Sequence, residues 1–200
     1  MVQTLETARL LLRPLTRDDL PFLAAMNADP VVARYLATGK PRPEAETRDW
    51  LEKTLRWYGE DGAGHLGIVL KEDGRLVGRC GLQPFEVEQG AEPARAWFGR
   101  GSAPTDARTA VVLELGYGLV PEAWGKGLAS EASRRMREVG FSRGEPKLMS
   151  VIHADNAASI KVAEKNGFSW RGELDFGGRI FRRYQLTREE WEALPPAQRP

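Results

Sequence analysis

The sequence has little of what marks secreted, membrane-spanning and nucleic-acid-binding proteins. A single cysteine in 200 residues, Cys80, excludes a disulfide within the chain. No apolar run approaches the roughly 20 residues of a membrane span, and the first residues show no basic stretch followed by an apolar one. A formal net charge of +1 supplies no long-range field for nucleic acid. We therefore expect a cytoplasmic protein with neither a membrane nor a nucleic-acid partner.

Metal ligands and reactive thiols are equally scarce. The two histidines, His65 and His153, lack metal-ligand spacing with another His or Cys, so we expect no metal. Cys80 lies in an apolar run with no His beside it, which favours a small core residue over a nucleophile. What is present, 42% hydrophobic and 28% charged residues, is typical of a globular protein. The length suits one domain over residues 1–200.

One stretch in the middle of the chain carries the strongest signal. The apolar run Ala110–Val120 predicts a strand, and Pro121 ends it because proline cannot donate to a sheet ladder. Trp124-Gly125-Lys126-Gly127-Leu128-Ala129 follows and leads into a helical pattern. A glycine turn at a helix start leaves several N–H groups pointing outward at the positive end of the helix dipole. This arrangement favours an anion, and the Lys126 charge adds to it.

Spacing separates the possible kinds of phosphate loop. The chain contains no GK[ST], so a Walker loop does not fit, and the third glycine of a dinucleotide fingerprint is replaced by Ser130. A plain helix-capping turn remains open. The stretch also resembles the acyl-coenzyme A pyrophosphate loop of the GNAT N-acetyltransferases, [QR]-x-x-G-x-[GA], in which Gly127 and Ala129 match while Trp124 replaces the Gln or Arg.

Further segments resemble the same family and occur in its order. Asn156 to Ser159 and Lys165-Asn166-Gly167-Phe168 resemble the N-x-x-S…E-K-x-G-F segment of the branch containing the ribosomal-protein alanine N-acetyltransferases. TARLLLRPL near the start and LTREEWEAL near the end resemble that branch too. The resemblance covers nearly the whole chain.

The order of predicted elements indicates an α/β fold. Strands are expected at 8–15, 65–70, 76–82, 110–120, 147–153, 168–173 and 179–186, and helices at 17–26, from about 43 to 58, 127–142, 156–166 and after Thr187. We interpret the polar segment Glu86–Arg108 as an insertion on the acceptor side, and the cluster Arg134, Arg135 and Arg137 as a solvated helix face. The resemblance implies a mixed, mostly antiparallel sheet with helices on both faces and a splayed pair of central strands.

The resemblance also implies how the donor, acetyl-coenzyme A, is held. The backbone of Leu119 and Val120 would pair with the pantetheine arm, and Trp124, Gly125, Lys126, Gly127, Leu128 and Ala129 would hold the pyrophosphate. Asn156 stands where the family's asparagine bonds the cofactor, although a helix N-cap is an equally good and compatible role.

Glu114 and Ser159 are the candidate catalytic residues. Glu114 interrupts an apolar run, where burial would raise the pKa of its carboxyl toward the range of a general base. The alternative is a carboxylate on a solvated face or one paired with an arginine. Ser159 is the candidate acid for the leaving thiolate, since the tyrosine that many family members have four residues later is Ala163 here. Ser159 could instead contribute to a helix cap, leaving water as the acid.

We expect an enzyme that transfers acetyl to a primary amine, and the branch favours a protein N-terminal amine. A small amine such as a polyamine, amino acid or amino sugar remains an alternative acceptor. The missing tyrosine also leaves open a non-catalytic sensor of acyl-coenzyme A. The chain is expected to act as a monomer or homodimer.

Overall fold

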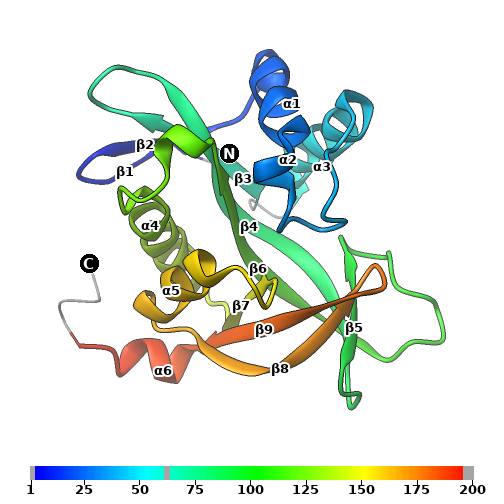
Figure 1. Cartoon of the computed structure of the whole chain (residues 1–200). Coiled ribbons are helices and arrows are strands. Elements are labelled where there is room, and N and C mark those ends of the chain that lie inside the picture. Colours follow the sequence, from blue (N-terminus) through cyan, green and yellow to red (C-terminus); the bar gives the residue numbers. More distant parts are fainter. Residues whose placement is uncertain (1–2, 61–63, 196–200) are drawn as a thin grey trace. The chain divides into compact units, whose positions relative to one another are not determined.

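The computed structural model describes residues 3–60 and 64–195 (Figure 1). These residues fall into two compact units. The first contains the chain up to Leu82 together with Gly116–Met136, and the second contains Gln83–Leu115 together with the chain from Arg137 onward. No described helix combines the length and apolarity needed to cross a membrane.

The strands of the first unit follow one another in sequence order and are all antiparallel. β1 (Leu5–Glu6) pairs with β2 (Leu10–Pro14), β2 pairs with β3 (Gly64–Leu70), and β3 pairs with β4 (Leu76–Glu88). The turn between β3 and β4 contains Gly74 at φ 73°, as the predicted Asp-Gly hairpin requires. The expected strand at 76–82 is thus part of a longer one that continues into the second unit.

Helices cover both faces of the strands in this unit. A 3-10 turn (Arg17–Asp19), α1 (Leu20–Ala28), the short α2 (Pro30–Ala33) and α3 (Glu44–Glu60) precede β3, and the first part of α4 (Leu128–Ser142) follows β6 (Thr109–Leu119). Arg79 places its guanidinium 4.4 Å from the ring centre of Trp50 in α3, whereas Cys80 Sγ lies 3.9 Å from Ser133 Oγ in α4. Because successive strand residues point to opposite faces, α3 and α4 cover opposite sides of β4. Cys80 is fully buried, as expected of a core residue.

Glycine allows β4 and the end of β6 to approach closely. A Cβ atom at Gly78 would lie 2.4 Å from the carbonyl oxygen of Gly118 and 2.8 Å from Cα of Leu119. Both atoms belong to the backbone, which cannot move aside cheaply. The last residues of β6 are therefore fixed against β4.

The second unit contains a mixed set of strands. From one side the order is β4, β5 (Ala94–Phe98), β8 (Ser169–Phe176), β9 (Arg179–Thr187), β7 (Lys147–Ile152) and β6. The β5–β8 and β7–β6 pairs are parallel and the others are antiparallel. The fold class expected from the sequence, a mixed and mostly antiparallel sheet with helices around it, is confirmed.

The segment Glu86–Arg108 is more regular than the sequence indicated. Its first residues extend β4 to Glu88, and Ala96-Trp97-Phe98 belongs to β5, which pairs with β4 through Phe85 and Phe98. The Glu86 carboxylate accepts N–H bonds from Gly101, Ser102 and Ala103 at 2.8, 3.0 and 2.7 Å, and these bonds lower the pKa of Glu86. The short apolar run, flanked by Pro and Gly, hid the strand.

The core of the second unit is made of apolar side chains from its strands. Its buried members come from β4, β5, β6, β7 and β8, and they are Phe85, Val87, Ala94, Ala96, Val112, Met149 and Leu174. The second part of α4, α5 (Ala157–Lys165) and α6 (Arg188–Glu192) complete the unit. Phe141 of α4 stacks on Trp191 of α6 with 4.9 Å between ring centres.

One prediction about α4 is wrong. Arg137 does not lie on a solvated face with its neighbours, because its side chain is fully buried. It donates to the Glu138 carboxylate at 2.8 and 2.5 Å and to the carbonyl oxygen of Asn166 at 2.8 Å. Trp191 Nε1 donates to the same carboxylate at 3.1 Å. The buried cation is paired and hydrogen-bonded, which is the condition for burying a charge.

Candidate active site

The glycine turn has the backbone geometry that an anion site requires. A 3-10 turn (Pro121–Ala123) leads to Trp124, and Gly125 and Gly127 have φ of 73° and 76°. Apart from Gly125 and its two chain neighbours, no described residue has an atom within 4 Å of a Cβ built on Gly125. Residues 124–127 are exposed, and α4 begins at Leu128. A left-handed turn at the start of a long helix presents N–H groups to solvent, so the chain fits a diphosphate at this place.

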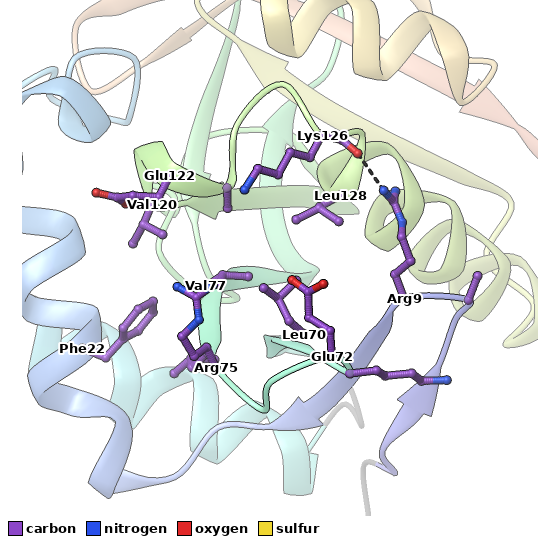
Figure 2. A pocket seen from close by; sticks show the side chains of 14 residues that line it. Arg9, Phe22, Leu70, Glu72, Arg75, Val77, Val120, Glu122, Lys126 and Leu128 are labelled. Carbon is purple, nitrogen blue, oxygen red and sulfur yellow. Dashed lines mark hydrogen bonds between the residues drawn. The ribbon is translucent and has the colours of Figure 1, made fainter.

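Arg9 braces this turn from the loop between β1 and β2. Arg9 Nη1 donates to the carbonyl oxygen of Lys126 at 2.9 Å (Figure 2), and its Nε donates to Glu131 Oε2 at 2.7 Å. The backbone N–H of Arg9 and the hydroxyl of Thr7 donate to Glu131 Oε1 at 2.8 and 2.6 Å. Burial alone would raise the pKa of Glu131, but the bonds from Thr7 and Arg9 outweigh it and lower the pKa. No local pattern in the sequence links residues 7–9 to residue 131, so this brace was not predicted.

A pocket of about 530 Å³ lies beside the turn within the first unit. Figure 2 shows Lys126 and Leu128 on one side of it and Arg75, Glu72 and Leu70 of the β3–β4 hairpin on the other. The volume is in the range of small-molecule sites, about 300–1,000 Å³. Within residues 3–60 and 64–195, the Lys126 ammonium makes no hydrogen bond or ion pair, so its charge is available to a ligand.

The two residues predicted to hold a pantetheine arm end β6. The Val120 N–H donates to the carbonyl oxygen of Val77 in β4 at 3.0 Å. The Leu119 carbonyl oxygen accepts a bond of 2.8 Å from the indole Nε1 of Trp124. Both backbone groups therefore have partners within the first unit.

Glu114 lies in the second unit, where it is buried and hydrogen-bonded. Its side chain is 6% exposed, and Oε2 accepts a bond of 2.7 Å from Gln83 Nε2 in β4. In the parallel β6–β7 pair, Glu114 pairs with Met149 of β7. It is therefore not on a solvated strand face. Gln83 was not predicted, because a glutamine in an apolar strand carries no signal of its own.

The first turn of α5 contains the other predicted residues of this unit. Asn156 Oδ1 accepts a bond of 3.1 Å from the Ser159 N–H, which confirms the N-cap role of Asn156. The Ser159 side chain is half-buried at that cap, and Ala163 occupies the buried face of the helix. The predicted site residues are thus divided: the backbone and loop residues belong to the first unit, and Glu114, Asn156 and Ser159 belong to the second.

Comparison with known families gives one match that spans most of the chain. Residues 9–169 match the family model described as "Acetyltransferase (GNAT) domain". Among curated relatives, the uncharacterized N-acetyltransferase p20 of Bacillus licheniformis is 28% identical over 174 residues, which are 86% of each chain. The spermidine N(1)-acetyltransferase of Escherichia coli strain K12 is 27% identical over 164 residues, 82% of this chain and 74% of that one.

Solved structures give the same architecture. An acetyltransferase from Agrobacterium tumefaciens strain C58 superposes with a TM-score of 0.70 at 26% identity, covering 94% of this chain and 96% of the other. RimL, an alpha-N-protein acetyltransferase of a ribosomal protein, solved in complex with coenzyme A, has a TM-score of 0.65 at 18% identity and coverage of 90% and 95%. The second likeness shows the fold alone.

Proposed function

Because this chain belongs to the GNAT acetyltransferase family, we propose that it acetylates a protein N-terminal amine with Glu114 as general base. The coarser activity follows from the family: the chain is an acetyl-coenzyme A-dependent N-acetyltransferase. The family match includes parts of both units, which supports the proposal that the whole chain works as one catalytic domain.

The observation that carries the role of Glu114 is a buried carboxylate that accepts a hydrogen bond from an amide. A carboxylate is costly to bury unless it is hydrogen-bonded, and Gln83 Nε2 supplies a neutral donor. This amide orients the carboxylate without neutralising its charge. Glu114 is thus suited to accept a proton from an amine.

The glycine turn is the proposed place for the donor's diphosphate. Outward N–H groups at Gly125–Ala129 and the charge of Lys126 would hold it, and the Arg9 brace keeps the turn in shape before any ligand arrives. The bound donor supplies an activated acetyl thioester. Asn156 would add a polar contact in the second unit while it caps α5.

The chain's own residues manage the protons of this transfer. A bond forms between the acceptor nitrogen and the acetyl carbon, and the bond from that carbon to sulfur breaks. Glu114 takes the proton released by the amine. The thiolate that leaves receives a proton from Ser159 or from solvent water.

Two observations bear on the acceptor. The formal net charge of +1 provides no long-range attraction for a polycation, which favours a peptide over a polyamine. The identity with spermidine N(1)-acetyltransferase, 27% over 82% of this chain, favours a polyamine as the second candidate.

The role of Glu114 is tested by Glu114→Gln. We expect turnover to fall about 10²- to 10⁴-fold while coenzyme A still binds with unchanged affinity. Glu88→Gln is the matched control, since Glu88 pairs with Arg95 at the β4–β5 edge of the same unit. Full activity of Glu114→Gln would remove Glu114 from the mechanism.

The acceptor is tested by thiol release with a panel of N-terminal peptides, polyamines and amino sugars. The proposal expects the highest kcat/KM for a peptide. A higher kcat/KM for spermidine would favour the second candidate instead.

A further inference from the structure

The alternation of backbone groups along β6 determines toward which edge of the strand the Leu119 carbonyl points. In a strand, the N–H and C=O of one residue point to one neighbour and those of the next residue point the opposite way. Val120 donates to Val77 of β4 at 3.0 Å. The Leu119 carbonyl therefore points to the edge of β6 that faces away from β4.

The indole of Trp124 occupies that edge. Its Nε1 donates to the Leu119 carbonyl oxygen at 2.8 Å, five residues back along the chain. The Trp124 side chain is nevertheless 45% exposed, and it is absent from the lining of the pocket beside Lys126. A large apolar ring is thus held at the end of β6 by one hydrogen bond and left open to solvent.

The same carbonyl has a second use in the proposed function. An arm containing amide groups can add to a strand edge by donating its N–H to an outward carbonyl, as an extra strand does. At Leu119 such a donor would meet the indole N–H, which already donates to this oxygen. Arm and indole would compete for this oxygen wherever both approach it from the same side.

We propose that Trp124 is a placeholder for the pantetheine arm: its indole satisfies the Leu119 carbonyl until a pantetheine amide displaces it. This inference rests on the donor site of the proposed function. It explains a tryptophan at the first position of the loop, where the family pattern has Gln or Arg, because a neutral indole N–H can be exchanged for an amide N–H at little cost. Affinity for the arm is set partly by how strongly this residue competes.

Trp124→Phe tests the competition, because the proposal expects this substitution to raise the affinity for coenzyme A and a merely structural role of Trp124 does not. Phenylalanine keeps an aromatic ring and removes the N–H. Loss of one competing hydrogen bond should tighten coenzyme A binding about two- to tenfold. Calorimetry measures this affinity and requires no turnover. Trp170→Phe is the matched control, since Trp170 is 60% exposed and donates its Nε1 to the Gly172 carbonyl at 2.9 Å in the second unit. The control should bind coenzyme A as the wild type does.

Two fragments of the donor localise the effect. Phosphopantetheine, which has the arm without the nucleotide, should show the same tightening in Trp124→Phe. ADP, which has a diphosphate without the arm, should bind both proteins equally. Trp124→Phe that binds coenzyme A equally or more weakly overturns the placeholder role and leaves the proposed function intact. Wild-type protein that binds no coenzyme A overturns both.

Discussion

Ser150 Oγ donates a hydrogen bond of 2.7 Å to the carbonyl oxygen of Leu115. The parallel register of β6 with β7 runs through Leu113–Leu148 and Glu114–Met149, so Ser150 and Leu115 stand one residue beyond it. Ser150 is 6% exposed. The Ser150 hydroxyl therefore satisfies the buried carbonyl of Leu115, the residue after Glu114. A backbone N–H of β7 would otherwise be expected to make this hydrogen bond.

Ser150→Ala should destabilise the protein by about 1–3 kcal/mol, because the Leu115 carbonyl would be left buried without this donor. The melting temperature should fall roughly 2–4 °C for each kcal/mol. Ser142→Ala is the control, since Ser142 Oγ makes a similar bond of 2.9 Å to Val139 on an exposed part of α4. Equal shifts for the two variants would contradict a special role of the Leu115 carbonyl.

Gly125→Ala and Gly74→Ala form a matched pair. Both glycines have φ of 73°, and a Cβ built on either has no atom of another described residue within 4 Å beyond its two chain neighbours. Each substitution should cost about 1–2 kcal/mol, because alanine is strained in the left-handed region. Only Gly125→Ala should weaken coenzyme A binding in calorimetry, since Gly74 lies in the β3–β4 hairpin. Equal affinity of the two variants would count against the glycine turn as the diphosphate site.

Gln83→Met should lower kcat about tenfold or more and leave the donor KM unchanged, because Glu114 loses the amide that orients it. It should also destabilise the protein by about 1–3 kcal/mol, because the buried Glu114 carboxylate loses this donor, although one change offsets part of the cost. Gln83 Oε1 is buried without a hydrogen-bond partner among the described residues, and methionine removes that atom as well. Gln89→Met is the control, since Gln89 bonds to the Val87 carbonyl at 2.9 Å in the same unit. A change in KM with kcat unchanged would speak against a positioning role.

At pH 7, Glu131→Gln should lower the free energy of unfolding by about 1 kcal/mol after solvent screening. The melting temperature should fall accordingly. The folded-state pKa of Glu131 lies below its ordinary value of 4.5, so its contribution is fully present above that pH and disappears as the pH falls through the folded value. The difference between wild type and variant should therefore shrink below about pH 4.5. Glu6→Gln, which affects the exposed Lys71 pair, should change stability little at any pH. A difference that stayed constant as the pH fell far below 4.5 would contradict the ionic origin of the brace.

Local chemistry made most of the fold predictable. Pro121 ended β6 within two residues of the expected place, and Gly177-Gly178 joined β8 to β9 as expected. The capping box of Thr187 and Glu190 starts α6. Each of these signals depends on residues close in sequence, where backbone preferences act directly.

The parts that were missed depend on long-range partners. Arg137 was expected in solvent because its own helix is rich in arginine, but Asn166 and Trp191 build the polar site that buries it together with Glu138. Gln83 and Arg9 acquire their roles from Glu114 and Glu131, which lie 31 and 122 positions away. A single sequence does not reveal such pairings.

Three elements pass through both units, because the boundaries at 82/83, 115/116 and 136/137 fall inside β4, β6 and α4. Chimeras built by exchanging one unit with that of a relative would therefore join foreign halves of a strand or a helix. Exchanges designed to alter acceptor preference are better joined at turns, such as Gly177-Gly178, where the junction falls between β8 and β9 and each strand comes whole from one parent.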